Sequence, residues 1–272
     1  MMKIDITPDG QASPDVVVDE DHVIRNYPIK DMKFKDHLGK WQKIKVVANE
    51  DETKHQLAEI FGEQHYKKGL IKKDMVIVDI GANIGCSVLY FQPWAKVIYA
   101  IEPVPYCYYC LVENTKKFSN VKTFNHGIFT VNGEMWLTGG TEDSPPQTTY
   151  QESRFVQPIN IKRLDTFFEE NKIDHVDLLK IDCEGAEYEI FLDDGFKNVA
   201  NKIDYIIGEA HNVPTISPEF LPNILKAVGF DAEFLPFDNL HYWLLYKNKT
   251  TGYKSKIFNQ QQTIFFAKHG QA

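Results

Sequence analysis

Short apolar runs and helix-like segments alternate along most of the chain. The runs are nearly continuous rather than alternating apolar with polar, which is typical of strands buried on both faces of a sheet. Runs of this kind predict strands at Met75–Ile80, Val97–Ile101, Val121–Asn125, Ile159–Arg163, Val176–Ile181 and Ile203–Gly208.

Between these strands, helix-length segments carry start and stop signals. Pro105 lies in a predicted first turn, Asp165 is a predicted N-cap, and Ser217 with Pro218 forms a cap followed by a first-turn proline. Gly229 ends the last of these segments. The predicted helices are 52–68, 83–91, 105–118, 164–171, 184–192 and the segment between Pro218 and Gly229.

This alternation indicates a doubly wound sheet with helices on both faces. After Gly229 the helices stop, and strand-like runs follow at Ala232–Phe237, His241–Tyr246 and Gln262–Ala267. The sequence therefore predicts an α/β, Rossmann-like fold with a mostly parallel seven-stranded sheet and a C-terminal antiparallel hairpin. We assign this fold to residues 51–272 and interpret residues 1–50 as an N-terminal extension with short strands.

Charge and apolar content exclude several classes of protein. The chain has 30 Lys and Arg against 38 Asp and Glu, a net charge of −8, which argues against a nucleic-acid partner. It has no apolar run long enough to span a membrane, and Met1–Gly10 lacks the apolar core of a signal peptide. We expect a cytoplasmic protein without a membrane partner; its oligomeric state is open, with a homodimer as one option.

The cysteines do not form a zinc motif. Cys107 and Cys110 make one CxxC pair, but no second pair or histidine pair stands at a fitting distance from it. With Cys86 and Cys183, they are expected to be free thiols in a reducing compartment.

The most informative local feature is a glycine loop, Gly81-Ala82-Asn83-Ile84-Gly85, between the first strong strand and its helix. Gly81 allows a sharp turn and the close approach of a ligand, and Gly85 allows the helix to pack closely on the strand. Unpaired N–H groups at the helix start would face that ligand. Such a glycine is often only a turn, so the loop alone does not define the ligand.

A second feature narrows the choice of ligand. Glu102 ends the next strand, where a carboxylate can accept hydrogen bonds from both hydroxyls of a ribose. Asn83 occupies the place of the second glycine of a dinucleotide loop, and Asp79 suits the positively charged amino end of S-adenosylmethionine (SAM) better than a pyrophosphate. These residues favour SAM, with an NAD(P)-dependent oxidoreductase as the alternative.

A third motif, Leu179-Lys-Ile-Asp-Cys-Glu-Gly-Ala-Glu187, follows the fourth predicted parallel strand. Together with Asp79–Gly85, Ile101-Glu102-Pro103 and Leu164-Asp-Thr-Phe167, it closely resembles the FkbM family of methyltransferases. The resemblance covers roughly residues 52–230. It implies a class I methyltransferase fold, SAM as cofactor, and methyl transfer to a hydroxyl group of a sugar or natural-product-like small molecule.

The resemblance also implies which residues hold the cofactor. Asp79, Gly81, Gly85 and Glu102 would bind SAM, and Asp182 would lie near its methionine end. The remaining predicted cofactor residues share these motifs or follow the third strand, where they would flank the adenine: Ala82, Asn83, Pro103, Asn125 and His126.

Methyl transfer to a hydroxyl needs an aligned acceptor and a group that takes its proton. The candidates are Asp182, Glu209 and His211, at the ends of the fourth and fifth parallel strands; Glu209 and His211 share one side by period-two alternation. His211 has the most suitable ordinary pKa. Asp182 can alternatively cap the helix after it. The three residues can also bind a divalent cation, although we do not predict a metal.

The acceptor itself is not encoded in a readable motif. The turn-rich stretch 133–157 is predicted to be a loop, and its part Gly139–Gln151 is our predicted acceptor-binding segment. Aromatic residues that can stack on a sugar or serve as core anchors are Trp136, Tyr150, Tyr242 and Trp243. A non-catalytic SAM-binding module is a further alternative.

Overall fold

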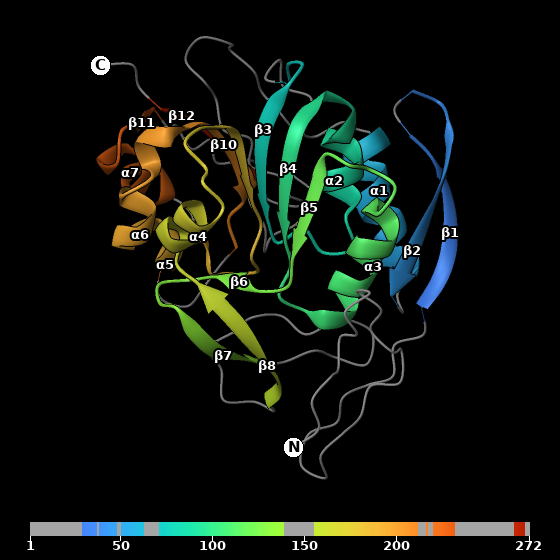
Figure 1. Cartoon of the computed structure of the whole chain (residues 1–272), viewed down its shortest axis with the longest axis horizontal. Helices are drawn as coiled ribbons and strands as arrows, with labels where there is room; N and C mark the ends of the chain where they lie inside the picture. Colours follow the sequence, from blue (N-terminus) through green and yellow to red (C-terminus); the bar gives the residue numbers. More distant parts are fainter. Residues whose placement is uncertain are drawn as a thin grey trace, which may run out of the picture. The chain divides into compact units, whose positions relative to one another are not determined.

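The structure is a computed structural model that describes residues 29–36, 38–47, 50–62, 71–138, 155–211, 216, 220–231 and 264–269. Its main sheet has seven strands in the order β11-β12-β10-β9-β3-β4-β5 (Figure 1). These strands are β3 (Met75–Ile80), β4 (Ala95–Ile101), β5 (Val121–Phe124), β9 (Val176–Ile181), β10 (Ile203–Glu209), β11 (Phe230–Asp231) and β12 (Ile264–His269).

The pairing of these strands confirms the predicted fold class. β3, β9 and β10 are parallel to one another, as are β4 and β5. β12 is antiparallel to both β10 and β11, which gives the predicted antiparallel C-terminal end of the sheet. β12 corresponds to the predicted run Gln262–Ala267, whereas Ala232–Phe237 and His241–Tyr246 lie outside the described residues.

The strand order places a topological switch point beside β3. The chain runs from β3 to β4 and β5 on one side, and β9 and β10 follow on the other side of β3. In open α/β sheets, ligands bind outside the carboxyl ends of the strands at such a point. β3 and β9 pair with Asp79 opposite Lys180 and Ile80 opposite Ile181, so their carboxyl ends lie next to each other.

The chain divides into two compact units, which we describe separately. The first comprises Met1–Met75, Gly81–Gly127 and Glu134–Asn160. It contains the antiparallel hairpin of β1 (Ile29–Lys35) and β2 (Trp41–Val47), α1 (Glu50–Leu57), α2 (Cys86–Phe91) and α3 (Pro105–Thr115). The assignment of residues 1–50 as an extension of the domain stays a prediction.

Within the first unit, one side chain of α3 links the β1–β2 hairpin to the glycine loop. Asn114 is buried, and its Oδ1 accepts a hydrogen bond of 2.6 Å from the backbone N–H of Lys45 in β2. Its Nδ2 donates to the carbonyl oxygens of Lys45 and Ile84, at 3.0 and 2.8 Å. A single amide thereby connects the hairpin with the end of the glycine loop.

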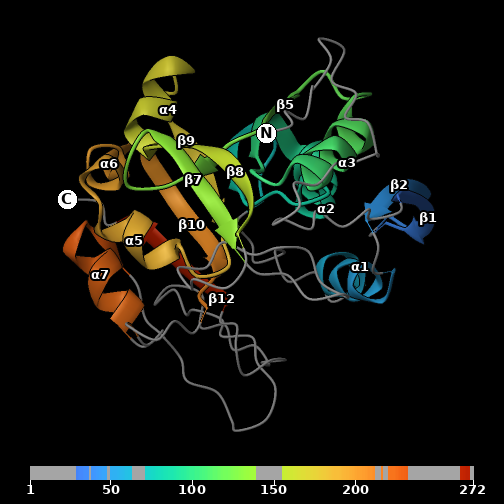
Figure 2. The same cartoon turned by 90° about the horizontal axis from the view of Figure 1, so that it is seen from below.

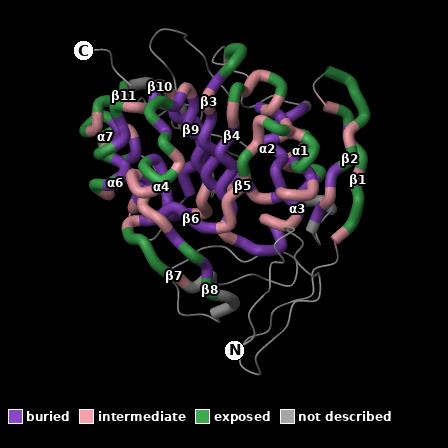
Figure 3. Tube along the Cα trace, in the orientation of Figure 1, coloured by how far each residue is buried: buried purple, intermediate pink, exposed green. Residues whose placement is uncertain are grey.

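The second unit comprises Val76–Ile80, Ile128–Gly133 and Ile161–Ala272. Its helices are α4 (Leu164–Glu170), α5 (Glu187–Leu192), α6 (Asp194–Lys197) and α7 (Leu221–Ala227). α5 contacts both α6 and α7, and Figure 2 shows these three helices together on one side of β10. In Figure 3, β9 and the carboxyl-terminal part of β10 are mostly buried, as their apolar sequences predict.

Two helices begin later than predicted, for the same physical reason. α2 begins at Cys86 rather than Asn83, and α5 begins at Glu187 rather than Glu184. The residues before them have left-handed backbone angles: φ is +48° at Asn83 and +96° at Gly85, and +55° at Glu184 and +111° at Gly185. An α-helix cannot include such residues, so both loops turn fully before the helix starts.

Other predicted boundaries also shift. α1 ends at Leu57 and continues as a π-helical segment, Ala58–Gly62, while residues 63–70 lie outside the described part of the chain. The capping residue of α4 is Arg163, whereas the predicted cap Asp165 forms an ion pair with Arg163 at 3.0 Å. The predicted cap Ser217 is not among the described residues.

The stretch predicted as one long loop contains strands at both ends. β7 (Gly133–Thr138) and β8 (Phe155–Lys162) join β6 (Gly127–Ile128) in a three-stranded sheet of order β6-β8-β7. The loop prediction was therefore too long, because strands in a small separate sheet need less apolar sequence than the buried strands of the main sheet. Residues 139–154, including the whole predicted acceptor segment Gly139–Gln151, lie outside the described residues.

Candidate functional site

The glycine loop of the first unit is a tight turn held by backbone hydrogen bonds. The N–H groups of Gly81 and Ala82 both donate to the carbonyl oxygen of Ile101, each at 3.0 Å. Gly85 donates to the carbonyl oxygen of Ala82 at 2.8 Å. A Cβ on Gly85 would lie 3.0 Å from a methyl carbon of Leu111, so this glycine lets α2 approach α3, not the strand as predicted.

Glu102, the residue directly after β4, joins two loops. The residue is 5% exposed, and its two carboxylate oxygens accept hydrogen bonds of 2.8 Å, one from the N–H of Asn83 and one from the N–H of Val104. A carboxylate oxygen has two lone-pair sites and can accept more than one hydrogen bond, and a ribose hydroxyl is a suitable donor. The sequence predicted the position of Glu102 but not its bonds to the glycine loop.

A residue after β5 binds the backbone that follows β4. Asn125 donates its side-chain amide to the carbonyl oxygens of Glu102 and Pro103, at 2.9 and 3.1 Å. His126 is buried and its Nδ1 lies 3.2 Å from the carbonyl oxygen of Gly127. Asn125 thus fixes the backbone beside Glu102 in addition to any contact with a ligand.

In the second unit, a buried lysine lies between two carboxylates at the ends of β3 and β9. Lys180 is 2% exposed, and its Nζ lies 3.2 Å from Oδ1 of Asp79 and 3.5 Å from Oδ2 of Asp182. Asp79 is fully buried. Lys180 therefore supplies the positive charge that a buried aspartate requires, which explains a lysine inside an apolar strand.

The predicted catalytic residues of β9 and β10 come together around the ring of His211. Its Nε2 lies 3.9 Å from Oδ1 of Asp182 and 4.0 Å from Oε2 of Glu209. Glu184, for which the sequence predicted no role, is closer, with its Oε2 at 3.3 Å from the same nitrogen. The ring is 7% exposed, so these carboxylates surround a buried imidazole.

A further residue that sequence reasoning missed is Glu187, in the first turn of α5. It is fully buried, and its Oε1 lies 2.9 Å from Nδ1 of His211. The same carboxylate accepts hydrogen bonds from the N–H groups of Cys183 and Gly185, at 2.7 and 3.0 Å. The only sequence signal was an acidic residue at a helix start, which is common without a special role.

This pairing determines the charge state of both groups. Burial alone lowers the pKa of His211, but Glu187, Glu184 and Asp182 outweigh burial and raise that pKa well above its ordinary value. Burial alone raises the pKa of Glu187, but the charge and hydrogen bond of His211 outweigh it and lower that pKa. The carboxylates therefore favour the charged form of His211, and His211 in turn favours the charged form of Glu187.

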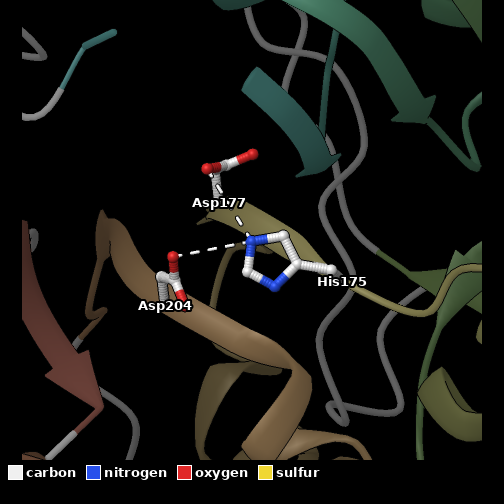
Figure 4. Close-up of side chains that lie close together, drawn as sticks. All are labelled: His175, Asp177 and Asp204. Carbon is white, nitrogen blue, oxygen red and sulfur yellow. Dashed lines mark ion pairs between the residues drawn. The ribbon is translucent and has the colours of Figure 1, made fainter. Parts of the chain in front are cut away.

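A second histidine cluster lies at the opposite ends of the same two strands (Figure 4). Nε2 of His175 lies 3.7 Å from Oδ1 of Asp177 and 3.5 Å from Oδ2 of Asp204. The His175 side chain is 52% exposed, so water solvates this group, unlike the ring of His211. Its composition makes it a matched comparison for the buried cluster.

The remaining predictions concern the aromatic residues near the acceptor, the cysteines and membrane-spanning helices. Tyr150, Tyr242 and Trp243 lie outside the described residues, and Trp136 lies in β7. The four cysteines are free thiols, as predicted. Among the described residues, no helix is both long and apolar enough to cross a membrane.

Comparisons with known proteins agree with the arrangement of these motifs. A family model described as "Methyltransferase FkbM domain" matches residues 79–232, more than half of the chain. "Methyltransferase sdnD" from Sordaria araneosa is 31% identical over 223 residues, which cover 65% of this chain and 84% of that protein. "2-O-methyltransferase NoeI" from Sinorhizobium fredii is 29% identical over 160 residues, covering 52% of this chain and 65% of that protein.

Among solved structures, a precorrin-6y C5,15-methyltransferase from Geobacter metallireducens is similar with a TM-score of 0.40. The two are 16% identical, and the match covers 74% of this chain and 85% of that one.

Proposed function

The chain belongs to the FkbM family of SAM-dependent methyltransferases, and we propose that it transfers the methyl group of SAM to a hydroxyl group of a small molecule. The family match carries this proposal, because it includes both the glycine loop and the motif Leu179–Glu187 around Asp182. A relative that is named a 2-O-methyltransferase supports oxygen as the methyl acceptor. We propose a sugar or a natural-product-like molecule as the substrate class.

The residues around the glycine loop fit the cofactor. Glu102 offers buried carboxylate oxygens at the end of β4, and carboxylate oxygens are suitable acceptors for ribose hydroxyls. Gly81 has a left-handed backbone and no side chain, which lets a ligand approach the loop. We propose that Asp79, Asp182 and the loop residues Gly81–Gly85 receive the amino-acid end. Bound SAM supplies a methyl group on a sulfonium, already attached to a good leaving group.

The protein must then remove the proton of the acceptor hydroxyl. Of the three predicted groups, we favour Glu209 as the proton acceptor. The carboxylates around His211 raise its pKa well above the ordinary value, which favours the protonated ring over the neutral ring that a proton acceptor requires. A well-placed base contributes about 10²- to 10⁴-fold to the rate.

The cellular setting is also a proposal. The net charge of −8 supports a small-molecule acceptor rather than a nucleic acid. Free thiols at all four cysteines are consistent with the predicted cytoplasmic location.

A transfer assay tests the proposed activity. Purified protein is incubated with labelled SAM and a panel of sugars and hydroxylated natural products, and both methylated product and S-adenosylhomocysteine are measured. We expect hydroxyl-dependent product formation that Glu209→Gln lowers about 10²-fold or more while SAM affinity is kept. Saturable SAM binding with no transfer to any hydroxyl in the panel would contradict the proposal and favour a non-catalytic SAM-binding module.

A further inference from the structure

The ring of His211 is oriented by a buried partner on one side only. Glu187 accepts the hydrogen bond from Nδ1–H, and two backbone N–H groups hold Glu187 in place. The backbone carbonyl of His211 is fixed as well, because the hydroxyl of Tyr188 donates to it at 2.9 Å. The position and tilt of the ring are therefore set independently of its other nitrogen.

That other nitrogen points into a group of carboxylates. Nε2 of His211 is buried and has no hydrogen-bond partner among the described residues, although the side chain is more than nine-tenths buried. The carboxylate oxygens of Glu184, Asp182 and Glu209 lie 3.3, 3.9 and 4.0 Å from it. The nitrogen is thus directed at carboxylate oxygens without forming a hydrogen bond to any of them in the part of the chain that the structure describes.

These separations suit the ligands of a metal ion. Ligand atoms about 2.1 Å from one ion lie roughly 3.0–3.5 Å from each other in tetrahedral or octahedral geometry. One ligand atom each from Asp182, Glu184 and His211 can be chosen so that all lie within 4.8 Å of one another, close enough for small side-chain rotations to complete a site. The hydrogen bond from Nδ1–H to a carboxylate is the usual way in which a protein orients a metal-binding histidine.

The excess of negative charge in the cluster also favours a bound cation. Four carboxylates, those of Asp182, Glu184, Glu187 and Glu209, surround the imidazole, and Lys180 pairs with one of them, Asp182, at 3.5 Å. A proton on Nε2 adds one positive charge, whereas a divalent cation adds two and contacts several oxygens at once.

We propose that Asp182, Glu184 and His211 bind one divalent cation. Resting on the proposed function, we further propose that this ion binds the acceptor's hydroxyl oxygen, with Glu209 beside it. A bound cation lowers the pKa of a coordinated hydroxyl and orients it. A ligand set of one imidazole and two carboxylates suits Mn²⁺ or Zn²⁺ better than Ca²⁺, which prefers oxygen ligands only.

The exposed cluster of His175, Asp177 and Asp204 provides the internal control. It has the same kinds of ligand atoms, but its histidine is half exposed and none of its ring nitrogens is buried without a partner. The proposal therefore predicts that only the buried cluster binds an ion tightly.

The test is a titration of the full-length protein, stripped with EDTA and desalted, with MnCl₂ alone. Free Mn²⁺ is followed by its electron paramagnetic resonance signal. We expect one tight site per chain, weakened more than about 100-fold in His211→Ala and Glu184→Gln and about 10- to 100-fold in Glu187→Gln. His175→Ala should leave the affinity unchanged. Thermal melts show whether each variant is folded.

Two results would overturn the metal site: wild-type protein that binds no Mn²⁺ or Zn²⁺ up to about 1 mM, or binding that persists in His211→Ala and is lost in His175→Ala.

The hydroxyl transfer assay, run with and without EDTA, separates the metal site from the proposed methyltransferase activity. Transfer that EDTA does not affect leaves the methyltransferase activity intact and contradicts a catalytic ion. One His211-dependent ion without any transfer confirms the site and contradicts the proposed activity.

Discussion

At the scale of residues, this protein buries charges in groups whose members hold each other in position. Lys180 lies between Asp79 and Asp182, while Glu187 is held by backbone N–H groups and orients His211. A buried charge without such partners is strongly unfavourable, so each group is sensitive to the loss of one member. Residues with a proposed functional role therefore also contribute to the stability of the fold.

Replacement of Lys180 by methionine tests this sensitivity. The variant leaves fully buried Asp79 without its cation, so we expect a loss of about 3–5 kcal/mol in the free energy of unfolding, measured by urea denaturation. Lys197→Met is the control, because Lys197 pairs with Asp194 on the surface and its loss should cost less than about 1 kcal/mol. Equal losses in the two variants would show that the buried ion pair has no special importance.

Glu102 gives a prediction about cofactor affinity. Glu102→Gln removes the charge that we assign to the ribose hydroxyls and turns one backbone acceptor into a donor facing an N–H group. We expect SAM to bind about 10- to 100-fold more weakly in calorimetric titrations, the size of one charge-assisted hydrogen bond. Glu134→Gln, the same change at an exposed position, should bind SAM like the wild type. Unchanged affinity in Glu102→Gln would exclude the ribose assignment.

At the scale of elements, short loops with left-handed residues decide where helices begin. The loops before α2 and α5 each place one non-glycine residue at positive φ, Asn83 and Glu184. Such a conformation costs about 1–2 kcal/mol for a residue with a side chain, so the contacts of the folded loops must compensate. In both loops, a carboxylate accepts a backbone N–H bond: Glu102 from Asn83, and Glu187 from Gly185.

The pairing of β9 with β10 depends on one glycine. A Cβ on Gly208 would lie 1.9 Å from the carbonyl oxygen of Ile181, which no side-chain movement can relieve. Gly208→Ala should therefore destabilise the protein by about 3 kcal/mol or more in urea denaturation. Gly39→Ala is the control: its φ is +74° but nothing lies within 4 Å, so we expect a cost of about 1–2 kcal/mol. A stable Gly208→Ala protein would refute this close approach.

At the scale of the whole molecule, the strand order and the family match both indicate the binding of a nucleoside-containing cofactor. The ligand edge of such a sheet lies at the switch point beside β3, and the matched region begins at Asp79, near the end of that strand. A ligand that binds only the folded chain must stabilise it by mass action.

Thermal denaturation with and without cofactor measures this linkage. SAM at about 100 times its Kd should add about 2.7 kcal/mol, which raises Tm by roughly 5–10 °C in a chain of this size. NADH at the same concentration should leave Tm unchanged. A shift with NADH and none with SAM would reverse the choice between a methyltransferase and an oxidoreductase.

The sequence by itself determined the buried strands β3, β4, β5, β9 and β10 of the main sheet, the fold class and the family. These follow from local patterns: apolar runs such as Met75–Ile80 and Val176–Ile181 became strands with the same bounds, and the glycine loop and Glu102 lie at the strand ends. Such information is local because burial on both faces of a sheet imposes its composition on each strand separately.

Only the tertiary structure decided which groups meet. Glu187 and His211 are 24 positions apart, and no local pattern joins a helix start to the residue that follows another strand. Their contact depends on the parallel register of β9 and β10 and on the left-handed turn at Glu184 and Gly185, which delays α5 until Glu187. The partners of a buried charge are set by such long-range packing, whereas the sequence shows only where charges are present.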